Sequence, residues 1–458
     1  MTASADAGPP GNAEGEQAPA VEQGLGWPLR LLYLGFPFWW FLGLANFIFP
    51  IMAVPMAVRL ARERRLRLPR GFALWALFLV WVLAGVFVLQ VDAPGAITGQ
   101  GGSNRYATFG YRVALYLAAT VALLYVGNLS ERELPSRRVA RLLAYMFVVT
   151  TVGGVVGALL PQIEFQSGLE TVLPNGLASN AYVQSLIHPR TSEVQTVLGY
   201  AESRPVAPFN YANAWGANLS FCLPFFLFAW FGRDAGWRRV VAPFILIAAL
   251  IPIVYSLNRG LWGALGVALV YVAVRLAVLG RGWALRGLIA GFVIAVLLFL
   301  LSPLNAIVQE RLAHPHSNER RGQLLSLTVS SALEGSPIIG FGTTRNVQGS
   351  FASIAGGQTD ACRGCGVPPL GTQGTLWSVT FYQGLVGAAL FLSFFAVRFF
   401  RHWRSSSPYA LIATTVLLMA GTEMFVYDFS GSPLVIIMIT LALAWREEER
   451  VSPWQRAG

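Results

Sequence analysis

The sequence contains no lysine, and all 33 of its basic residues are arginine. Charged residues make up only 12% of the chain, whereas a soluble globular protein carries about 25%, so a soluble fold is excluded. Three cysteines are too few to build a disulfide scaffold. What is abundant is apolar: 55% of the residues are hydrophobic and the mean hydropathy is +0.55, as in a polytopic membrane protein.

The net charge of +11 would suit either nucleic acid or acidic lipid as a partner. The distribution of the arginines decides between them, because the arginines fall in short clusters between apolar runs. This is the positive-inside pattern of a membrane protein. Membrane lipid is therefore an expected partner, and nucleic acid is not.

Apolar runs long enough to cross a membrane, which takes about 20 residues, recur along the chain. They lie at roughly 72–91, 109–127, 141–160, 211–231, 240–257, 260–280, 284–303, 375–400, 408–426 and 433–446. The first apolar stretch, 27–58, is too long for one upright span and short for two, and Pro50 and Pro55 favour a broken pair. We expect an all-α integral membrane protein with about 11 or 12 transmembrane helices, 12 being slightly preferred.

Arginine clusters set the orientation of these spans. When the runs are threaded alternately, the clusters all fall on one side, which is then the cytoplasm. They lie at 59–70, 132–141, 233–239, 275–286, 398–404 and 446–450. Residues 1–26 are small, polar and acidic and predict a disordered tail, 27–446 form the polytopic membrane domain, and 447–458 form a cytoplasmic tail.

Two long loops, at about 161–209 and 304–373, face the opposite, outer side. Both have helical patterning. In the second loop, apolar residues at helical spacing predict an amphipathic helix over 318–334 that lies on the bundle. Loops of this length in a compact protein usually bind or cover something.

A second set of arginines lies on the outer side. Arg259 stands just before a span that begins at about Gly260, so its guanidinium would lie beside the unsatisfied N–H groups and positive dipole of a helix N-terminus. That combination suits phosphate, although an interfacial arginine reaching the lipid headgroups explains Arg259 equally well. Other outer arginines would suit a pyrophosphate if they converge there, namely Arg204, Arg311, Arg320 and Arg321. Simple pairing with loop acids is the favoured interpretation of Arg190, Arg345 and Arg363.

The sequence has no obvious cluster of metal ligands. Its four histidines are scattered: His188, His314, His316 and His402. Only His314 and His316, in HPH, are a minor candidate for a metal site. There is no phosphate-cradling glycine motif, Ser-His-Asp pattern or acidic pair in the loops, so any reaction is expected to use no metal and no cofactor. Cys362 and Cys365, in CRGC, suit a tight disulfide better than half of a metal site.

Three stretches in order resemble the O-antigen ligase and polymerase family: "YSLNRGLWGAL", "SNERRGQLLSLTVSSALEGSPIIGFGTTR" and "GTQGTLWSVTFYQGLVGAALF". The second contains a turn of the sPlxGxG type, formed by Ser336, Pro337, Gly340 and Gly342. The third runs from Gln373 to a glycine eleven residues later, Gly384. The resemblance covers roughly 200–395, together with the layout of about 12 spans and a large late outer loop.

The resemblance implies transfer of a glycan from a polyprenyl (undecaprenyl) pyrophosphate carrier to an acceptor hydroxyl, on the outer face of the bacterial inner or plasma membrane. It also implies the C-type glycosyltransferase superfold, with arginines rather than a metal on the pyrophosphate. By matching position Arg259 is the best of these arginines, Arg204 and Arg311 follow, and Arg320 or Arg321 matches the arginine at the start of the loop helix. The acceptor (another glycan, a lipid or a wall polymer) and the choice between ligase and polymerase stay open.

Gln373 departs from the family, which commonly has a histidine there that is proposed to activate the acceptor. Glutamine orients a hydroxyl but cannot take its proton. Another group would then be the base, and the candidates are Glu319, His316, Glu423 and Asp428. Alternatively the pyrophosphate leaving group makes a base unnecessary, or the chain binds a lipid-linked glycan without transferring it.

A transporter or flippase of lipid-linked sugar is the competing function from another class. It would favour charged residues in mid-span and repeat symmetry between the two halves, and the sequence offers neither clearly.

Overall fold

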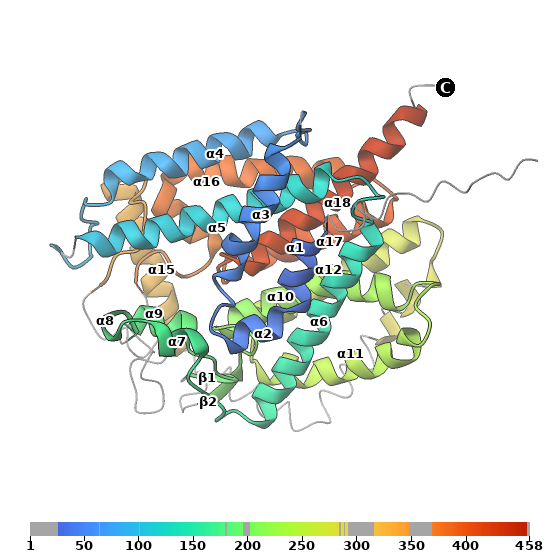
Figure 1. Cartoon of the computed structure of the whole chain (residues 1–458), viewed down its shortest axis with the longest axis horizontal. Helices are drawn as coiled ribbons and strands as arrows, with labels where there is room; N and C mark the ends of the chain where they lie inside the picture. The colour runs from blue at the N-terminus through green and yellow to red at the C-terminus, as the bar shows by residue number, and fades with distance from the viewer. Residues whose placement is uncertain are drawn as a thin grey trace, which may run out of the picture.

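The computed structural model is a bundle of helices (Figure 1). It describes residues 26–455 except 64, 100, 179–180, 196–201, 284, 288, 292–315 and 348–368. Among these residues, six helices are long and apolar enough to cross a membrane. They are α5 (Ser103–Asn128), α6 (Ser136–Leu159), α10 (Ala212–Trp230), α11 (Arg238–Tyr255), α12 (Arg259–Val278) and α16 (Thr375–His402). The prediction of a mostly helical protein with apolar helices long enough to span a membrane is confirmed, whereas the predicted number of about 11 or 12 spans stays a prediction.

The remaining apolar helices are shorter or carry more charge. They are α4 (Phe72–Ala84), which continues as the 3₁₀ helix η2 (Gly85–Val88), α17 (Pro408–Glu423) and α18 (Ser432–Gln455). The predicted run at 284–303 lies largely outside the described residues. Every other predicted run coincides with a helix, and α18 continues through most of the segment expected to be a tail.

The N-terminal stretch 27–58 is a broken pair of helical arms. One arm consists of α1 (Trp27–Leu34) and α2 (Phe36–Phe41), and the other is α3 (Ile48–Ala61). The arms are joined by a turn in which Gly43 has a positive φ of 79°. Each arm is short for an upright span, as its proline content suggested.

Aromatic side chains form much of the contact between α4, α5 and α16. Trp75 of α4 is fully buried, and its ring centroid lies 5.3 Å from that of Phe394 and 6.2 Å from that of Tyr116. Phe78 packs edge-on against Tyr116 and Phe391. Each aromatic pair is worth about 0.5–1.5 kcal/mol beyond its buried area, so this cluster fixes the three helices relative to one another.

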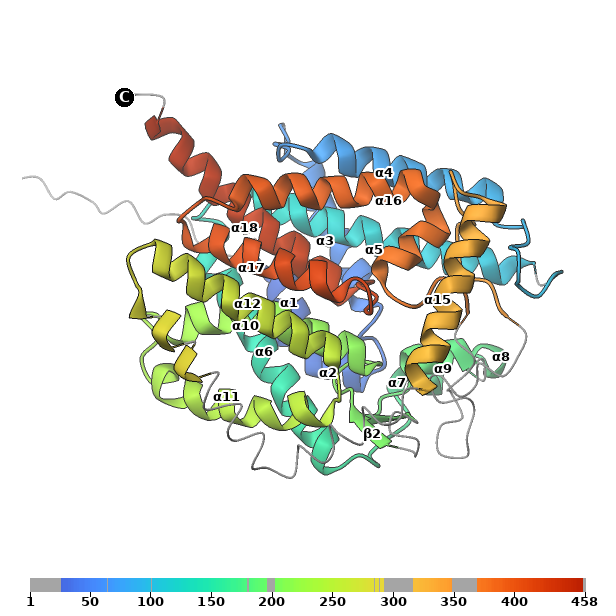
Figure 2. The same cartoon turned by 180° about the vertical axis from the view of Figure 1, so that it is seen from behind.

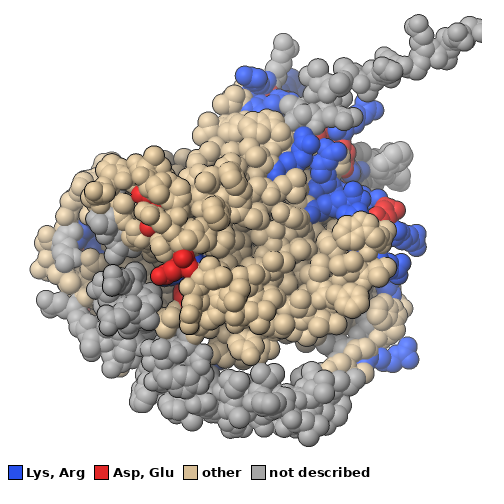
Figure 3. Space-filling model, turned by 60° about the horizontal axis from the view of Figure 1, so that its bottom comes forward, with Lys and Arg blue, Asp and Glu red and all other residues tan. Residues whose placement is uncertain are grey.

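Arginines gather along one side of the molecule, on the side where the C-terminus emerges (Figure 3). There Glu131 of the α5–α6 connection pairs with Arg446 at 2.7 Å and Arg450 at 2.6 Å, and Arg67 pairs with Glu449 at 2.7 Å. The clusters that fall on one side in the sequence therefore also meet in space around the end of α18. Their gathering agrees with the predicted threading of the spans.

The described helices of the two long loops lie at the other end of the molecule and are next to each other in both views (Figures 1 and 2). The first contains α7 (Gly168–Val172), α8 (Asn175–Ala178) and α9 (Ala181–Ile187). It also contains an antiparallel hairpin, β1 (Ser192–Gln195) and β2 (Glu202–Pro205), which the sequence did not predict. The second loop contains α15 (His316–Gly335), which confirms the helix predicted over 318–334 and crosses the beginning of α16 (Figure 2).

Helix α16 is interrupted at Gly384, which has φ 65° and ψ −172°. Such a break leaves backbone groups without helical partners in a buried part of the bundle, and these groups need other partners. The turn that follows α15 supplies them. Its three hydrogen bonds join Phe341 N to the Phe381 carbonyl (2.9 Å), Gly342 N to the Tyr382 carbonyl (2.8 Å) and Leu385 N to the Pro337 carbonyl (2.7 Å). Trp81 of α4 adds a fourth bond, from its indole N–H to the Gln383 carbonyl, at 2.8 Å.

Glycine is needed where this turn meets the break. A Cβ on Gly384 would overlap the carbonyl oxygen of Ile338, and a Cβ on Gly340 would lie 2.5 Å from the Tyr382 carbonyl carbon. Gly340 and Gly342 also have positive φ, of 72° and 73°. The sPlxGxG turn and Gly384 of α16 therefore pack directly against each other.

Replacing Gly384 with alanine should destabilise the protein strongly. Alanine is strained at this φ and ψ and its methyl group would displace the turn, so we expect a loss above about 3 kcal/mol in the free energy of unfolding. Thermal unfolding of the purified protein in detergent measures it. Gly266→Ala is the matched control, because its Cβ meets nothing within 4 Å and alanine favours a helix by up to about 1 kcal/mol. Equal melting temperatures for the two variants would contradict this account of the break.

Candidate functional site

Residues 424–430, between α17 and α18, form a segment that holds two helix N-termini together. The Tyr427 carbonyl accepts hydrogen bonds from the backbone N–H (2.8 Å) and hydroxyl (2.9 Å) of Thr375, at the start of α16. The Tyr427 hydroxyl accepts the backbone N–H of Leu261 at 2.7 Å, in the first turn of α12. Segment 424–430 thus links the region of Gln373 with the region of Arg259.

Two glycines let these helix starts approach the segment closely. A Cβ on Gly260 would lie 2.7 Å from the Val426 side chain, and a Cβ on Gly374 would lie 2.7 Å from the carbonyl carbon of Phe425. Gly374 also has a positive φ of 132°. A larger residue at either position would separate a helix N-terminus from Tyr427.

Arg259 is the first residue of α12 and is exposed. The N-terminus of α12 directs its backbone N–H groups and the positive end of its dipole toward the same region. One of these groups, on Leu261, is bonded to Tyr427. The structure thus combines an exposed guanidinium with a helix N-terminus, as the sequence predicted.

Arg204 is placed differently from Arg259. It lies opposite Glu193 in the β1–β2 hairpin and is only 3% exposed. Its Nε donates to the Ser256 carbonyl and its Nη2 to Asn258 Oδ1, both at 2.6 Å, while Nη1 lies 3.8 Å from Glu193. Burial lowers the pKa of Arg204 and the carboxylate of Glu193 opposes that shift. In this conformation Arg204 braces the turn before Arg259 rather than facing solvent.

Gln373 and Asp428 are close in sequence to the Thr375–Tyr427 contact, two residues before Thr375 and one after Tyr427. Gln373 is half-buried, and its amide donates to the Thr372 hydroxyl at 3.2 Å. Asp428 is exposed, and one of its carboxylate oxygens accepts the Ser430 N–H at 2.9 Å. Glu423, by contrast, is 0% exposed, and among the described residues neither of its carboxylate oxygens has a hydrogen-bond partner. Asp428 is therefore the carboxylate of this pair that a ligand can reach.

A recess lies between α5, α16 and segment 424–430. Its polar lining consists of Arg112, Thr375, Ser378, Tyr382, Asp428 and Ser430, and Tyr116 and Phe391 are among its apolar walls. The guanidinium carbon of Arg112 lies 3.5 Å from the centroid of the Tyr382 ring, a cation–π contact. The sequence signal for Arg112 was an arginine inside a predicted span, whereas no motif marks Tyr382 or Tyr427.

The other predicted site residues lie in the second long loop. Glu319, Arg320 and Arg321 are in the first turns of α15, and their side chains are not described. Arg311, Cys362 and Cys365 lie outside the described residues. The structure therefore brings Arg259, Gln373 and Asp428 around one segment, with Arg204 behind them.

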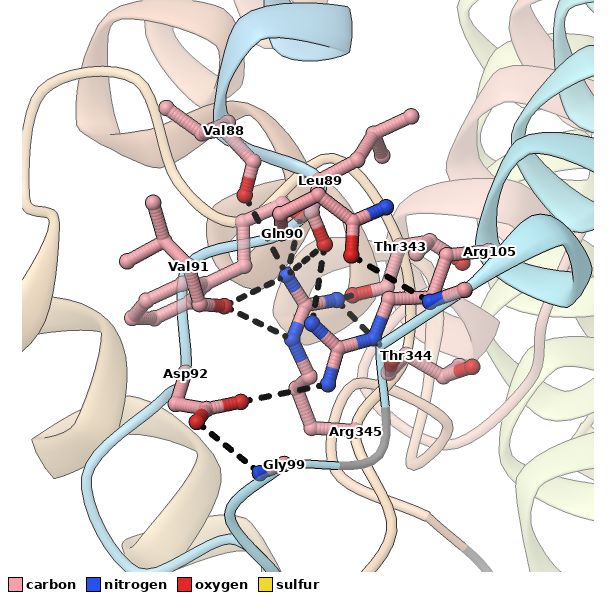
Figure 4. A network of polar contacts seen from close by, with 12 residues as sticks. Val88, Leu89, Gln90, Val91, Asp92, Gly99, Arg105, Thr343, Thr344 and Arg345 are labelled. Carbon is pink, nitrogen blue, oxygen red and sulfur yellow. Dashed lines mark hydrogen bonds and ion pairs between the residues drawn. The ribbon is translucent and has the colours of Figure 1, made fainter.

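Arg345 donates an extensive set of hydrogen bonds to described residues at this end of the molecule (Figure 4). It is 2% exposed, and its guanidinium donates to backbone carbonyls of η2, the loop after it and its own turn. These acceptors are Val88, Leu89, Val91, Phe341, Thr343 and Thr344, at 2.9–3.3 Å. Pairing with a loop acid was the predicted role of Arg345, and its hydrogen bonds to the described residues are instead to backbone carbonyl groups.

Arg105 and Asp92 complete this network. Arg105 donates to the Leu89 carbonyl at 2.9 Å and pairs with Asp92 at 3.3 Å. The Gly99 N–H and the Arg105 guanidinium hold the pKa of Asp92 below its ordinary value. Burial lowers the pKa of Arg345 to about 10, the nearby Arg105 acts in the same direction and Asp92 opposes it, so Arg345 remains charged at neutral pH. The network holds the turn after α15, which bonds to the break in α16, against the α4–α5 connection.

Arg345→Lys should lower stability although it keeps the charge. Lysine has three donors on one atom and cannot reach carbonyls in the planar fan that a guanidinium reaches. Several buried carbonyls would lose their partners, and we expect a loss of at least about 2 kcal/mol in the free energy of unfolding. Thermal unfolding measures this loss, and Arg239→Lys, at an exposed arginine near the start of α11, is the control. An unchanged melting temperature for Arg345→Lys would refute the role given to the fan of bonds.

A scan against models of known protein families and a search of curated proteins both gave no match to this chain. The functional argument therefore rests on the residues and contacts described above.

Proposed function

We propose that the protein is a membrane glycosyltransferase of the O-antigen ligase or polymerase type. It would transfer a glycan from a polyprenyl pyrophosphate carrier to an acceptor hydroxyl. The observation that carries this proposal is the position of Arg259. It is exposed at the N-terminus of α12, and Tyr427 ties that terminus to the segment that bears Asp428.

The Arg259 region suits the pyrophosphate of the donor. Backbone N–H groups at a helix N-terminus bind phosphate oxygens, and the guanidinium binds two oxygens at once. Arg204 holds the turn that presents Arg259, through its bonds to Ser256 and Asn258. Arg311, Arg320 and Arg321 of the second long loop are the proposed further donors to the pyrophosphate.

In the proposed reaction the acceptor oxygen attacks the sugar carbon that carries the pyrophosphate. A carbon–oxygen bond to the acceptor forms, the bond to the pyrophosphate oxygen breaks, and the acceptor proton passes to the Asp428 carboxylate. Gln373 orients the acceptor hydroxyl by hydrogen bonding, since an amide cannot take the proton. Arg259 stabilises the negative charge that develops on the leaving polyprenyl pyrophosphate.

The proposed reaction takes place on the outer face of the bacterial inner or plasma membrane. The arginine-rich side would face the cytoplasm by the positive-inside rule. Arg259 and the two long loops would then face outward, where a lipid carrier presents its glycan.

Arg259→Ala tests the proposal in cells that assemble the surface glycan. We expect assembly to fall at least about 100-fold, since two charge-assisted hydrogen bonds of 1.5–3 kcal/mol are lost. The protein should still insert and accumulate, because Arg259 is exposed. Arg239→Ala, an exposed arginine on the arginine-rich side, is the matched control and should assemble glycan normally. Assembly that persists with Arg259→Ala would contradict the proposed donor site.

A further inference from the structure

We infer that the recess between α5, α16 and segment 424–430 is a subsite for a hydroxyl group of a neutral sugar, the acceptor. Arg112 would donate a hydrogen bond to that hydroxyl and Asp428 would accept one. This inference rests on the proposed function, because it names where the acceptor of that reaction is held.

Arg112 is held rigidly at the recess. It lies nine residues into α5 and three residues inside the predicted span 109–127. An ionisable residue within a span is rare and usually serves a ligand or a pathway. Its guanidinium stacks on Tyr382, whose hydroxyl donates to the Gly371 carbonyl and whose own carbonyl accepts Gly342 N. The N–H donors of a guanidinium lie in its own plane, and Arg112 is one of the residues that line the recess.

Hydrogen-bond acceptors also line the recess. A carboxylate offers about four lone-pair sites, and the Ser430 N–H uses one of those on Asp428. The hydroxyl of Ser378 donates to the Gly374 carbonyl at 2.8 Å, which leaves its oxygen lone pairs as acceptors toward the recess. A recess lined by both donor and acceptor groups matches a hydroxyl, which both donates and accepts.

Charge and size select the ligand. Arg112 and Asp428 carry opposite charges, so the recess has little net charge and does not favour an anion, in contrast to the end of α12 with Arg259. The cavity volume is about 20 Å³, slightly more than one ordered water needs. Such a recess admits one hydroxyl group while the sugar ring stays outside. The neutral acceptor would therefore be bound at the recess and the charged leaving group at the N-terminus of α12.

The test measures, by saturation-transfer NMR, the binding of neutral methyl glycosides to the purified full-length protein in the absence of any lipid donor. We expect the wild type to bind at least one glycoside of the panel. Arg112→Met removes the N–H donors but keeps an apolar chain on Tyr382, and it should weaken binding at least about 10-fold, the loss of one charge-assisted hydrogen bond. Asp428→Asn, at an exposed position that tolerates substitution, should weaken binding similarly. Arg259→Ala should bind the glycoside as the wild type does.

The outcomes separate the subsite from the proposed reaction. The inference is overturned if no glycoside binds the wild type, if Arg112→Met and Asp428→Asn bind normally, or if Arg259→Ala loses binding as well. If Arg112→Met does not fold, Asp428→Asn decides alone. Glycoside binding with the expected pattern, in a protein that transfers no glycan, would sustain the subsite and reject the proposed transfer. Measuring carrier binding with polyprenyl pyrophosphate alone completes the separation, because Arg259→Ala should lose it and Arg112→Met should keep it.

Discussion

Where the backbone of an apolar helix is broken, other protein groups must supply the missing hydrogen bonds. The hydrogen bonds made at the break of α16 at Gly384 determine how the end of the molecule with the candidate site is arranged. The turn after α15 provides the missing hydrogen bonds, so the second long loop is anchored inside the bundle. Arg345 then ties the same turn to the carbonyls that follow α4. Three regions far apart in sequence are held in one arrangement, and Tyr382, beside the break, forms a wall of the recess.

Charged residues at this end of the molecule include some that are buried and bonded to protein groups and others that are exposed. Arg345 and Arg204 are buried and bonded to protein groups, so they position the turns around the site. Arg259 and Asp428 are exposed and lie close in sequence to the Leu261–Tyr427 contact, so ligands can reach them. The expense of burying charge in an apolar bundle explains why the buried arginines have so many partners. The same reasoning makes the exposed pair the better candidates for chemistry.

The sequence predicts the helical spans and α15 because periodicity and length are local properties of the chain. Arg259 was also found from sequence, since a helix start next to an arginine is a local pattern. The role of Arg345 could not be found in this way, because the carbonyls of Val88, Leu89 and Val91 lie about 250 residues earlier in the chain, and carbonyls leave no mark in a sequence. From sequence Arg204 resembles a ligand-binding arginine. Only its position opposite Glu193 in the hairpin shows that it binds protein groups instead. The β1–β2 hairpin was missed because its strands are only four residues each.

The most direct measurement of the central claim is single-turnover transfer by the purified wild-type protein, with a polyprenyl pyrophosphate-linked glycan as donor and a glycan acceptor. The account predicts that glycosylated acceptor and free polyprenyl pyrophosphate appear together in equal amounts. Gln373→His serves as the comparison, since it restores the residue common in the resembling family. Transfer by Gln373→His alone, with none by the wild type, would contradict the account and make the natural protein a binder of lipid-linked glycan.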